Sequence, residues 1–263
     1  MTSISGSDLP AVAPDWRAGS TQSGSLHISA RDVALALVIV GVPLLLAHVF
    51  VLTMNFGFGH SYLFGLAEKF NLNDEMNIPT LVATLELLAC GVMLAANARF
   101  RPGGRGQASG WWVLCAIFVF LGFDENASLH EMTSGPTANL LQADWVPEYA
   151  WMIPYGLALL IVAAVLLPWF LKIDRASQIR FVVAGTIFVA GALGIEILES
   201  ANVSTADFEM TADGPALADV SLSLAVLTTV QECMEYIGAG YFLYALVLRL
   251  DGLTIGAATS RNS

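Results

Sequence analysis

Residues 149–171 read YAWMIPYGLALLIVAAVLLPWFL, without one charged side chain. A stretch of this length is sufficient to cross a hydrocarbon layer of about 30 Å as an α-helix. Apolar stretches of similar length lie on both sides of it, so we expect six spans in all. Their predicted ranges are 32–54, 78–98, 110–132, 149–172, 180–203 and 220–249. The sequence therefore predicts an all-α fold, a polytopic transmembrane helix bundle.

The composition of the whole chain agrees with this fold class. Of its 263 residues, 56% are hydrophobic and 13% are charged, whereas about a quarter of the residues of a soluble domain are charged. The three cysteines lie in apolar stretches without a CxxC pair, which is typical of small buried side chains. The net charge of −11 argues against nucleic acid as a partner. A soluble enzyme and a disulfide-rich secreted domain are excluded.

The polar segments define the domain organisation. Residues 1–30 are rich in Ser, Gly, Ala and Pro, and we expect them to form a mobile polar tail. No signal-peptide pattern follows Met1, so the first apolar stretch is expected to remain as a span. The prediction is a single six-helix domain over 31–250, followed by a short tail over 251–263.

Basic residues give the orientation. If the N-terminus is cytoplasmic, the cytoplasmic side holds ten of the eleven basic residues, and Lys69 is alone on the outer side. The ten are Arg17, Arg31, Arg99, Arg101, Arg105, Lys172, Arg175, Arg180, Arg249 and Arg261. Such a bias is the positive-inside signal of an integral membrane protein. It predicts that both termini are cytoplasmic.

Acidic residues concentrate in the outer half of the predicted bundle. Eight carboxylates lie there, from four spans, and they are Glu86, Asp124, Glu125, Glu131, Glu196, Glu199, Glu232 and Glu235. His130 lies among them, and no Lys or Arg does. A charged side chain at the centre of a span costs roughly 2.5–3.5 kcal/mol. The compensation must come from bound cations, from protons shared between carboxyls or from water.

The spacing of these residues favours a metal site. Each of the two Glu-x-x-Glu pairs projects from one helix face, and Asp124 and Glu131, seven residues apart, would share a face of a third helix. Carboxylate-bridged di-metal sites use acids and histidines from four facing helices in this way. We expect metal ligation by the eight carboxylates and His130, with Glu86 the least certain to join the others. His130 and Glu131 are the candidates for proton transfer during catalysis.

The sequence does not identify the metal. Di-iron bundles use Glu-x-x-His pairs, and none occurs in the predicted spans, which argues against iron. Manganese, zinc, calcium and magnesium remain open, because oxygen-rich sites suit hard cations, and the sequence does not separate iron from them conclusively. His60 precedes the second span and is interpreted as an interface histidine rather than a ligand.

Two motifs resemble those of a group of small bacterial polytopic membrane proteins. They are FDENASLHEM at 123–132 and QECMEYIGAGYFLYAL at 231–246, which contain a DE-x4-HE sequence and a late glutamate pair. The glutamate pair of the Gly-rich fifth span, Glu196 and Glu199, belongs to the same resemblance. The resemblance extends in outline over 78–249. It implies a bacterial inner-membrane protein with a carboxylate site. The group is uncharacterised, so it implies no reaction.

Three functions remain open from the sequence. The favoured one is a membrane-embedded metalloenzyme, an oxidoreductase or a hydrolase, that acts on an amphiphilic small molecule from the lipid bilayer. The alternatives are a cation or proton transporter or channel, and a non-catalytic subunit with a structural metal site. The oligomeric state stays open. Glycines in the last two spans are expected to permit close helix packing, namely Gly185, Gly191, Gly194, Gly238 and Gly240.

Overall fold

The computed structural model describes residues 26–101, 103–104, 106–142, 147–202 and 220–255. The helices belong to one compact unit, Ile28–Leu253. Strand β1 (Leu26–Ile28) pairs with β2 (Leu253–Ile255), and His27 Nδ1 lies 3.0 Å from Thr254 Oγ1. The predicted tails fall mainly outside the described residues.

The six predicted spans correspond to helical segments in the same order. The long helices are α1 (Ala30–Leu52), α3 (Ile78–Phe100), α4 (Ala108–Ala127), α6 (Met152–Phe170), α7 (Arg175–Val189) and α9 (Leu222–Arg249). Shorter ones are α2 (Leu66–Phe70), α5 (Ser134–Leu141) and α8 (Glu196–Asn202). The remaining turns are the π-helical η1 (Thr53–Gly57) and η5 (Ala190–Ile195) and the 3-10 turns η2 (Leu63–Gly65), η3 (Glu131–Thr133) and η4 (Pro147–Trp151).

Side-chain caps fix where four of these helices begin. Ser29, Asn77, Asp174 and Ser221 precede α1, α3, α7 and α9, and each accepts a hydrogen bond from a backbone N–H in the first turn. Such a cap satisfies one of the N–H groups that a helix leaves without an internal partner. The sequence thus sets the starts of the spans more sharply than apolar length alone does.

Five helical segments of the described chain are long and apolar enough to cross a membrane. They contain α1, α3, α4, α6 and the continuous run of α7, η5 and α8. Helix α9 is longer than most of them but does not meet this standard, so the expectation of six apolar spans is confirmed for five. The fold is all-α, and its apolar helices are those of an integral membrane protein.

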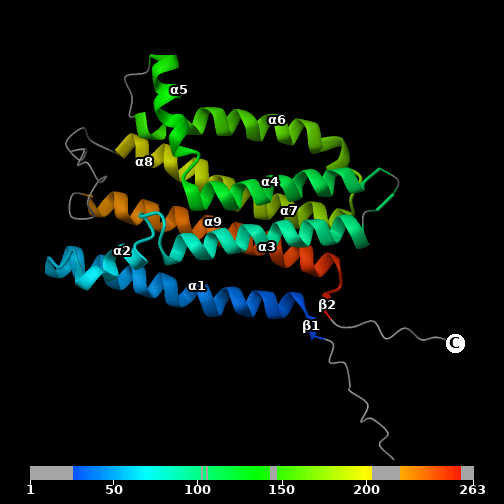
Figure 1. Cartoon of the computed structure of the whole chain (residues 1–263), viewed down its shortest axis with the longest axis horizontal. Helices are drawn as coiled ribbons and strands as arrows, with labels where there is room; N and C mark the ends of the chain where they lie inside the picture. Colours follow the sequence, from blue (N-terminus) through cyan, green and yellow to red (C-terminus); the bar gives the residue numbers. More distant parts are fainter. Residues whose placement is uncertain (1–25, 102, 105, 143–146, 203–219, 256–263) are drawn as a thin grey trace, which may run out of the picture. The chain divides into compact units, whose positions relative to one another are not determined.

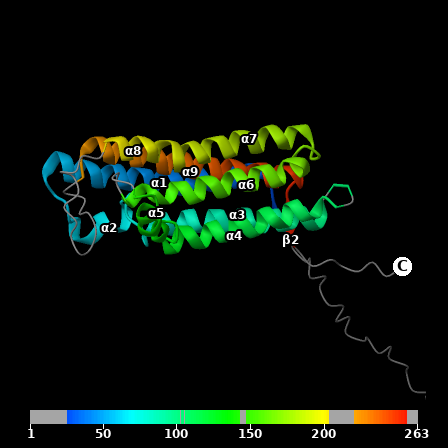
Figure 2. The ribbon, with the colours of Figure 1, turned by 90° about the horizontal axis from the view of Figure 1, so that it is seen from above.

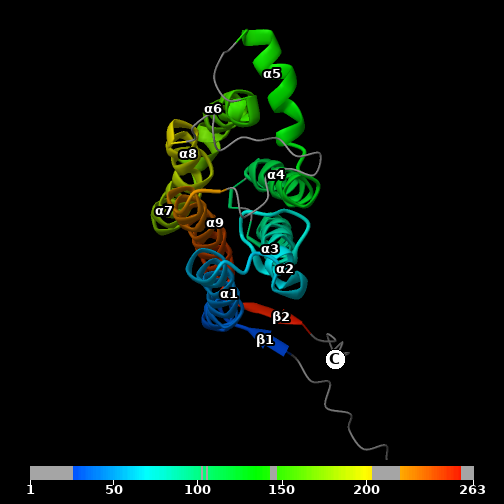
Figure 3. The ribbon, with the colours of Figure 1, turned by 90° about the vertical axis from the view of Figure 1, so that its left-hand side faces the viewer.

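The polar helix α9 lies between other helices. It packs against α7 on one side and against α3 and α1 on the others, and Figure 3 shows it between them. In contrast, α1 and α6 lie at opposite edges of the bundle (Figure 1). Only 11% and 6% of the most apolar stretch of their segments, Ala30–Gly57 and Tyr149–Phe170, is buried. The exposed apolar faces at these edges are suited to lipid.

The main hydrophobic core lies at one end of the bundle, where α3 and α9 end and α4 and α7 begin (Figure 2). It includes Trp111, Leu94 and Leu246, all without measurable solvent exposure. Arg249 covers this core, since its guanidinium lies 4.4 Å from the centre of the Trp111 ring and 2.8 Å from Asn97 Oδ1. This end therefore holds the apolar packing, while the acids of α8 and those at the end of α4 lie toward the other.

The glycine prediction is right at three positions. A Cβ on Gly191 or Gly238 would approach the backbone of the facing helix within about 3 Å, and one on Gly240 would lie 2.7 Å from the Glu86 carboxylate. It is wrong at the other two. An added Cβ meets nothing within 4 Å at Gly185 and only Ala190 Cβ at 3.9 Å at Gly194, because both glycines lie on exposed faces.

Candidate metal centre

Helix α4 ends earlier than the sequence predicts. It stops at Ala127, and Ser128 takes a left-handed conformation with φ 49° and ψ 39°. The N–H groups of Ser128 and Leu129 both bond to the carbonyl oxygen of Asp124, which closes the end of the helix. His130 and Glu131 consequently lie beyond the helix. The expectation that Asp124 and Glu131 share a helical face is wrong.

The reversal at Ser128 brings His130 back to Asp124. His130 Nδ1 lies 3.3 Å from Asp124 Oδ2, and Asp124 Oδ1 accepts a hydrogen bond from the Tyr155 hydroxyl at 2.8 Å. The imidazole also stacks edge to face on Trp151, with 4.7 Å between the ring centres. Both oxygens of Asp124 are thus engaged. The carboxylate orients the imidazole and leaves Nε2 available to a ligand.

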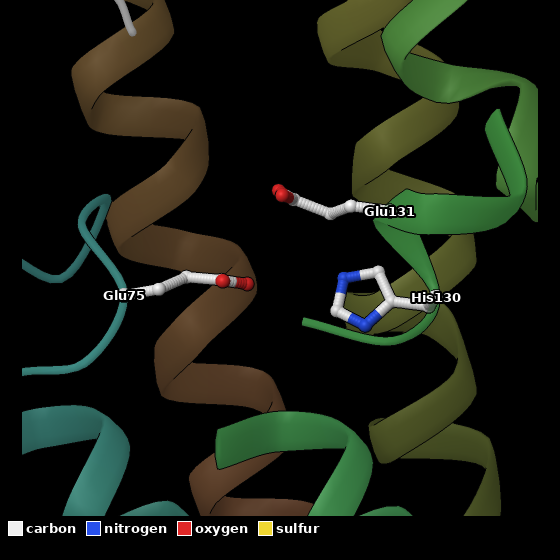
Figure 4. Close-up of side chains that lie close together, drawn as sticks. All are labelled: Glu75, His130 and Glu131. Atoms are coloured by element: carbon white, nitrogen blue, oxygen red, sulfur yellow. The ribbon is translucent and has the colours of Figure 1, made fainter. Parts of the chain in front are cut away.

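Glu75 completes a group that the sequence analysis did not select. It lies in the loop 71–77, between α2 and α3. One potential ligand atom from each of Glu75, His130 and Glu131 lies within 4.8 Å of the other two. Figure 4 shows the two carboxylates and one ring nitrogen of His130 turned toward the same space. Glu75 and His130 are half-buried and Glu131 is exposed, so solvent reaches the group.

The electrostatic environment of this group favours a cation. Burial and, to a lesser extent, the nearby carboxylate of Glu131 together raise the pKa of Glu75 to about 7. Burial alone would lower the pKa of His130, but its hydrogen bond to Asp124 and the surrounding negative charges outweigh burial and raise it. Carboxylates that repel one another in this way are stabilised by any positive charge placed between them.

Glu196 and Glu199 have hydrogen-bond partners of their own. Glu196 accepts bonds from Trp151 Nε1 and from Gln231 Nε2, both at 3.1 Å. Glu199 is buried and accepts a bond from the Thr228 hydroxyl at 2.9 Å. These partners hold α8 against α9 and η4. Trp151 donates to Glu196 and also stacks on His130, so it connects Glu196 with the group formed by Glu75, His130 and Glu131.

The remaining acids of α4 and α9 interact through their charges. The charge of Glu235 acts on Glu232, and the charges of Glu125 and Glu196 act on both. The two arginine ion pairs found in the described part, Arg101–Asp251 and Arg249–Asp174, lie at the opposite end of the bundle. The acids of α4, α8 and α9 therefore do gather on one side, as the sequence predicts, with His130 nearby.

A π-helical segment and a glycine set how closely α8 approaches α9. The segment η5 ends immediately before Glu196, and π-helical turns often occur at functional sites. Within η5, a Cβ on Gly191 would lie 3.0 Å from the Gln231 carbonyl and 3.1 Å from Glu235 Cγ. The missing side chain at Gly191 lets η5 reach the turn of α9 that carries Gln231 and Glu235.

Glu86 lies apart from these acids. It is 6% exposed, its Oε1 has no hydrogen-bond partner, and this atom faces Gly240. The charge of Glu86 acts on the side chains of Cys90 and Tyr236 rather than on the other acids. His60 is exposed and is not part of the group at Glu75.

Comparison with known proteins adds a family but no function. The chain matches no curated protein and no solved structure. A family model, described as a domain of unknown function (DUF8692), matches residues 33–250, which include every long helix almost completely and the whole acidic region. The chain belongs to the DUF8692 family, a domain of unknown function.

Proposed function

We propose that this integral membrane protein binds a divalent metal ion through Glu75, His130 and Glu131, with Asp124 as the residue that orients His130. The observation that carries the proposal is the convergence of these three side chains within 4.8 Å. The Asp124–His130 contact supports the same proposal, because a histidine that binds a metal through one ring nitrogen commonly donates a hydrogen bond from the other N–H to a carboxylate.

The donor set limits the metal and the chemistry. One imidazole and two carboxylates suit zinc, manganese or iron(II) better than calcium, which prefers oxygen ligands alone. An ion held by three side chains retains open coordination positions and supplies Lewis-acid activation of water or of a substrate oxygen. Glu125, Glu232 and Glu235 lie behind this centre as further carboxylates for a second ion or for proton exchange.

The favoured function is therefore a metal-dependent membrane enzyme, a hydrolase or an oxidoreductase. The partial exposure of the centre supports access by substrate. The apolar faces of α1 and α6 support an amphiphilic substrate that reaches it from the bilayer. A structural metal site would require a closed coordination shell, which the exposed Glu131 does not favour.

Thermal unfolding of the purified full chain in detergent tests the binding. Manganese or zinc at 100 times its dissociation constant is expected to add about 2.7 kcal/mol of stability, because the ion binds only the folded chain. The melting temperature should rise with metal and fall with a chelator. A melting temperature that neither treatment changes would contradict the proposal.

We further propose that the chain lies in a bacterial inner membrane with both termini in the cytoplasm. Its support is the distribution of charge. The basic residues of the described part other than Lys69 lie at the end of the bundle remote from the proposed centre. These are Arg31, Arg99, Arg101, Lys172, Arg175, Arg180 and Arg249. Positive residues are retained on the cytoplasmic side, which puts the metal centre near the outer surface.

Cysteine labelling tests this orientation with two matched glycines. Gly135 and Gly104 lie at opposite ends of the bundle, and a Cβ at either has ample space. In intact cells, a membrane-impermeant maleimide should label the Gly135→Cys variant and leave the Gly104→Cys variant unlabelled. The wild-type chain is the control for its three native cysteines. Labelling of Gly104→Cys alone would reverse the orientation.

Cation transport is the second candidate, favoured by the carboxylates that continue from the centre into the bundle. The buried apolar core at the other end argues against it, since Leu94, Trp111 and Leu246 fill that end without solvent exposure. Reconstituted vesicles are expected to show no manganese, zinc or proton flux above that of empty vesicles. Flux that the Glu232→Gln variant abolishes would favour a transporter over the enzyme.

A further inference from the structure

The loop 71–77, which carries Glu75, is shaped by its own asparagines. The side-chain amide of Asn77 donates hydrogen bonds to the carbonyl oxygens of Asn71 at 2.6 Å and of Asp74 at 2.8 Å. The side-chain oxygen of Asn77 caps α3. These bonds define the shape of the loop and join it to α3. They do not reach α1 or α9.

His48 of α1 joins this loop to the rest of the bundle. Its Nδ1 accepts a hydrogen bond from the Leu72 N–H at 3.0 Å, and its Nε2 lies 2.9 Å from Thr229 Oγ1 on α9. The side chain is 1% exposed. One imidazole thus connects α1, α9 and the loop that carries Glu75.

The hydrogen-bond donors allow a single arrangement at His48. A backbone N–H can only donate, so the N–H of Leu72 requires that His48 Nδ1 carry no proton. The Thr229 hydroxyl donates its hydrogen to the Ala225 carbonyl at 2.6 Å, so its oxygen accepts from Nε2–H of His48. A neutral histidine with its proton on Nε2 satisfies the bonds to Leu72 and Thr229. Histidine thus serves both partners at once, whereas the bond to Leu72 by itself requires only an acceptor at the position of Nδ1.

The hydrogen bond between Leu72 and His48 lies close in the chain to Glu75 of the proposed metal centre. Glu75 follows Leu72 by three residues, whereas His130 and Glu131 belong to the segment after α4. The two segments are far apart in the chain. The distance between the Glu75 carboxylate and the other two side chains consequently depends on how the loop is fixed to the bundle.

We propose that His48 is a positioning residue of the metal centre, which holds the loop 71–77 through Leu72 so that Glu75 meets His130 and Glu131. This inference rests on the proposed metal site and assigns His48 no contact with the ion. Removal of a residue that orients a metal ligand typically weakens metal binding by about 10–100-fold.

Three variants separate positioning from general stability. His48→Asn places an oxygen near the position of Nδ1 and can still accept from Leu72, whereas His48→Gln places its amide near Nε2 and loses that acceptor. Thr229→Val removes the other partner of His48. Each variant loses a buried hydrogen bond, so each should lower the melting temperature of the full chain. Manganese and zinc affinity should fall at least about tenfold only in His48→Gln.

A second readout does not depend on metal. In a chain without Cys115 and Cys233, cysteines replacing Glu75 and Glu131 should be joined rapidly by a short bis-maleimide, since carboxylate oxygens of the two side chains they replace lie within 4.8 Å of each other. His48→Gln should slow this cross-linking, and His48→Asn should leave it close to the rate with His48 intact. If the wild-type chain binds no metal while cross-linking follows this order, His48 positions the loop and the metal proposal fails.

Equal cross-linking in the three backgrounds would overturn the role of His48, whatever the metal result. An affinity loss that follows the melting temperature across His48→Asn, His48→Gln and Thr229→Val would also overturn it, because such a loss reports general stability. Tight metal binding in His48→Gln would leave the metal centre in place and remove His48 from it.

Discussion

Replacement of Gly238 by alanine is expected to destabilise the protein by about 3 kcal/mol, the upper part of the range for added volume in a packed interior. A Cβ at this position of α9 would lie 2.6 Å from the Phe188 nitrogen and 2.8 Å from Phe188 Cα. These are backbone atoms of α7, which no rotamer change can move. The two helices must separate, and the separation extends toward the contact of Gly191 with α9.

A matched control exists in the neighbouring helix. An alanine Cβ at Gly185 of α7 meets nothing within 4 Å, and alanine is favoured over glycine within a helix by about 1 kcal/mol. The melting temperature in detergent should therefore fall clearly for Gly238→Ala and stay equal or rise for Gly185→Ala. A Gly238→Ala protein that melts with the wild type would show that α7 and α9 do not pack this closely.

The second large effect concerns metal affinity. Glu75→Gln and His130→Ala each remove one of the proposed ligands, so affinity for manganese or zinc should fall by more than about 100-fold, beyond the usual effect of an orienting residue. Asp124→Asn keeps all three ligands and disturbs only the orientation of His130, so its loss should be about 10–100-fold. Isothermal titration of the full chain in detergent measures this order.

Glu86→Gln is the control for charge removal in this series. Glu86 is an acid of the same type, but it faces Gly240 and does not join the group at Glu75. Its replacement should leave metal affinity unchanged. If Glu86→Gln weakens binding as much as Glu75→Gln, the ion lies deeper in the bundle than the proposed centre.

The spans were predictable because their physical cause is local. Uncharged length identifies a segment such as α6, and a capping side chain such as Asn77 identifies where α3 begins. The gathering of acids was also predictable, because carboxylates without basic partners share one side of the bundle. The sixth predicted span, over 220–249, is not confirmed, because α9 carries Glu232 and Glu235 and does not meet the same standard of apolar length.

The composition of the site was not predictable to the same degree. The end of α4 depends on a left-handed serine, Ser128, without a glycine or proline to mark it. From the sequence alone, Glu75 is interpreted as a solvated loop residue. The pair of acids Asp74 and Glu75, just before a span, was the one sequence feature that could have indicated a site there. Only the fold shows that His48 connects this loop to α1 and α9. The sequence likewise does not show that Gly185 and Gly194 lie on exposed helix faces, because this depends on which side of the helix packs against a neighbour.

The most direct test of the central claim is the metal content of the full chain purified in detergent, measured beside the His130→Ala variant after equal exposure to manganese and zinc. Elemental analysis should find at least one divalent ion per wild-type chain and a large loss in His130→Ala at equal folded content. A wild-type chain that retains no ion, or a His130→Ala chain that retains the same amount, would contradict the assignment of Glu75, His130 and Glu131 as a metal centre.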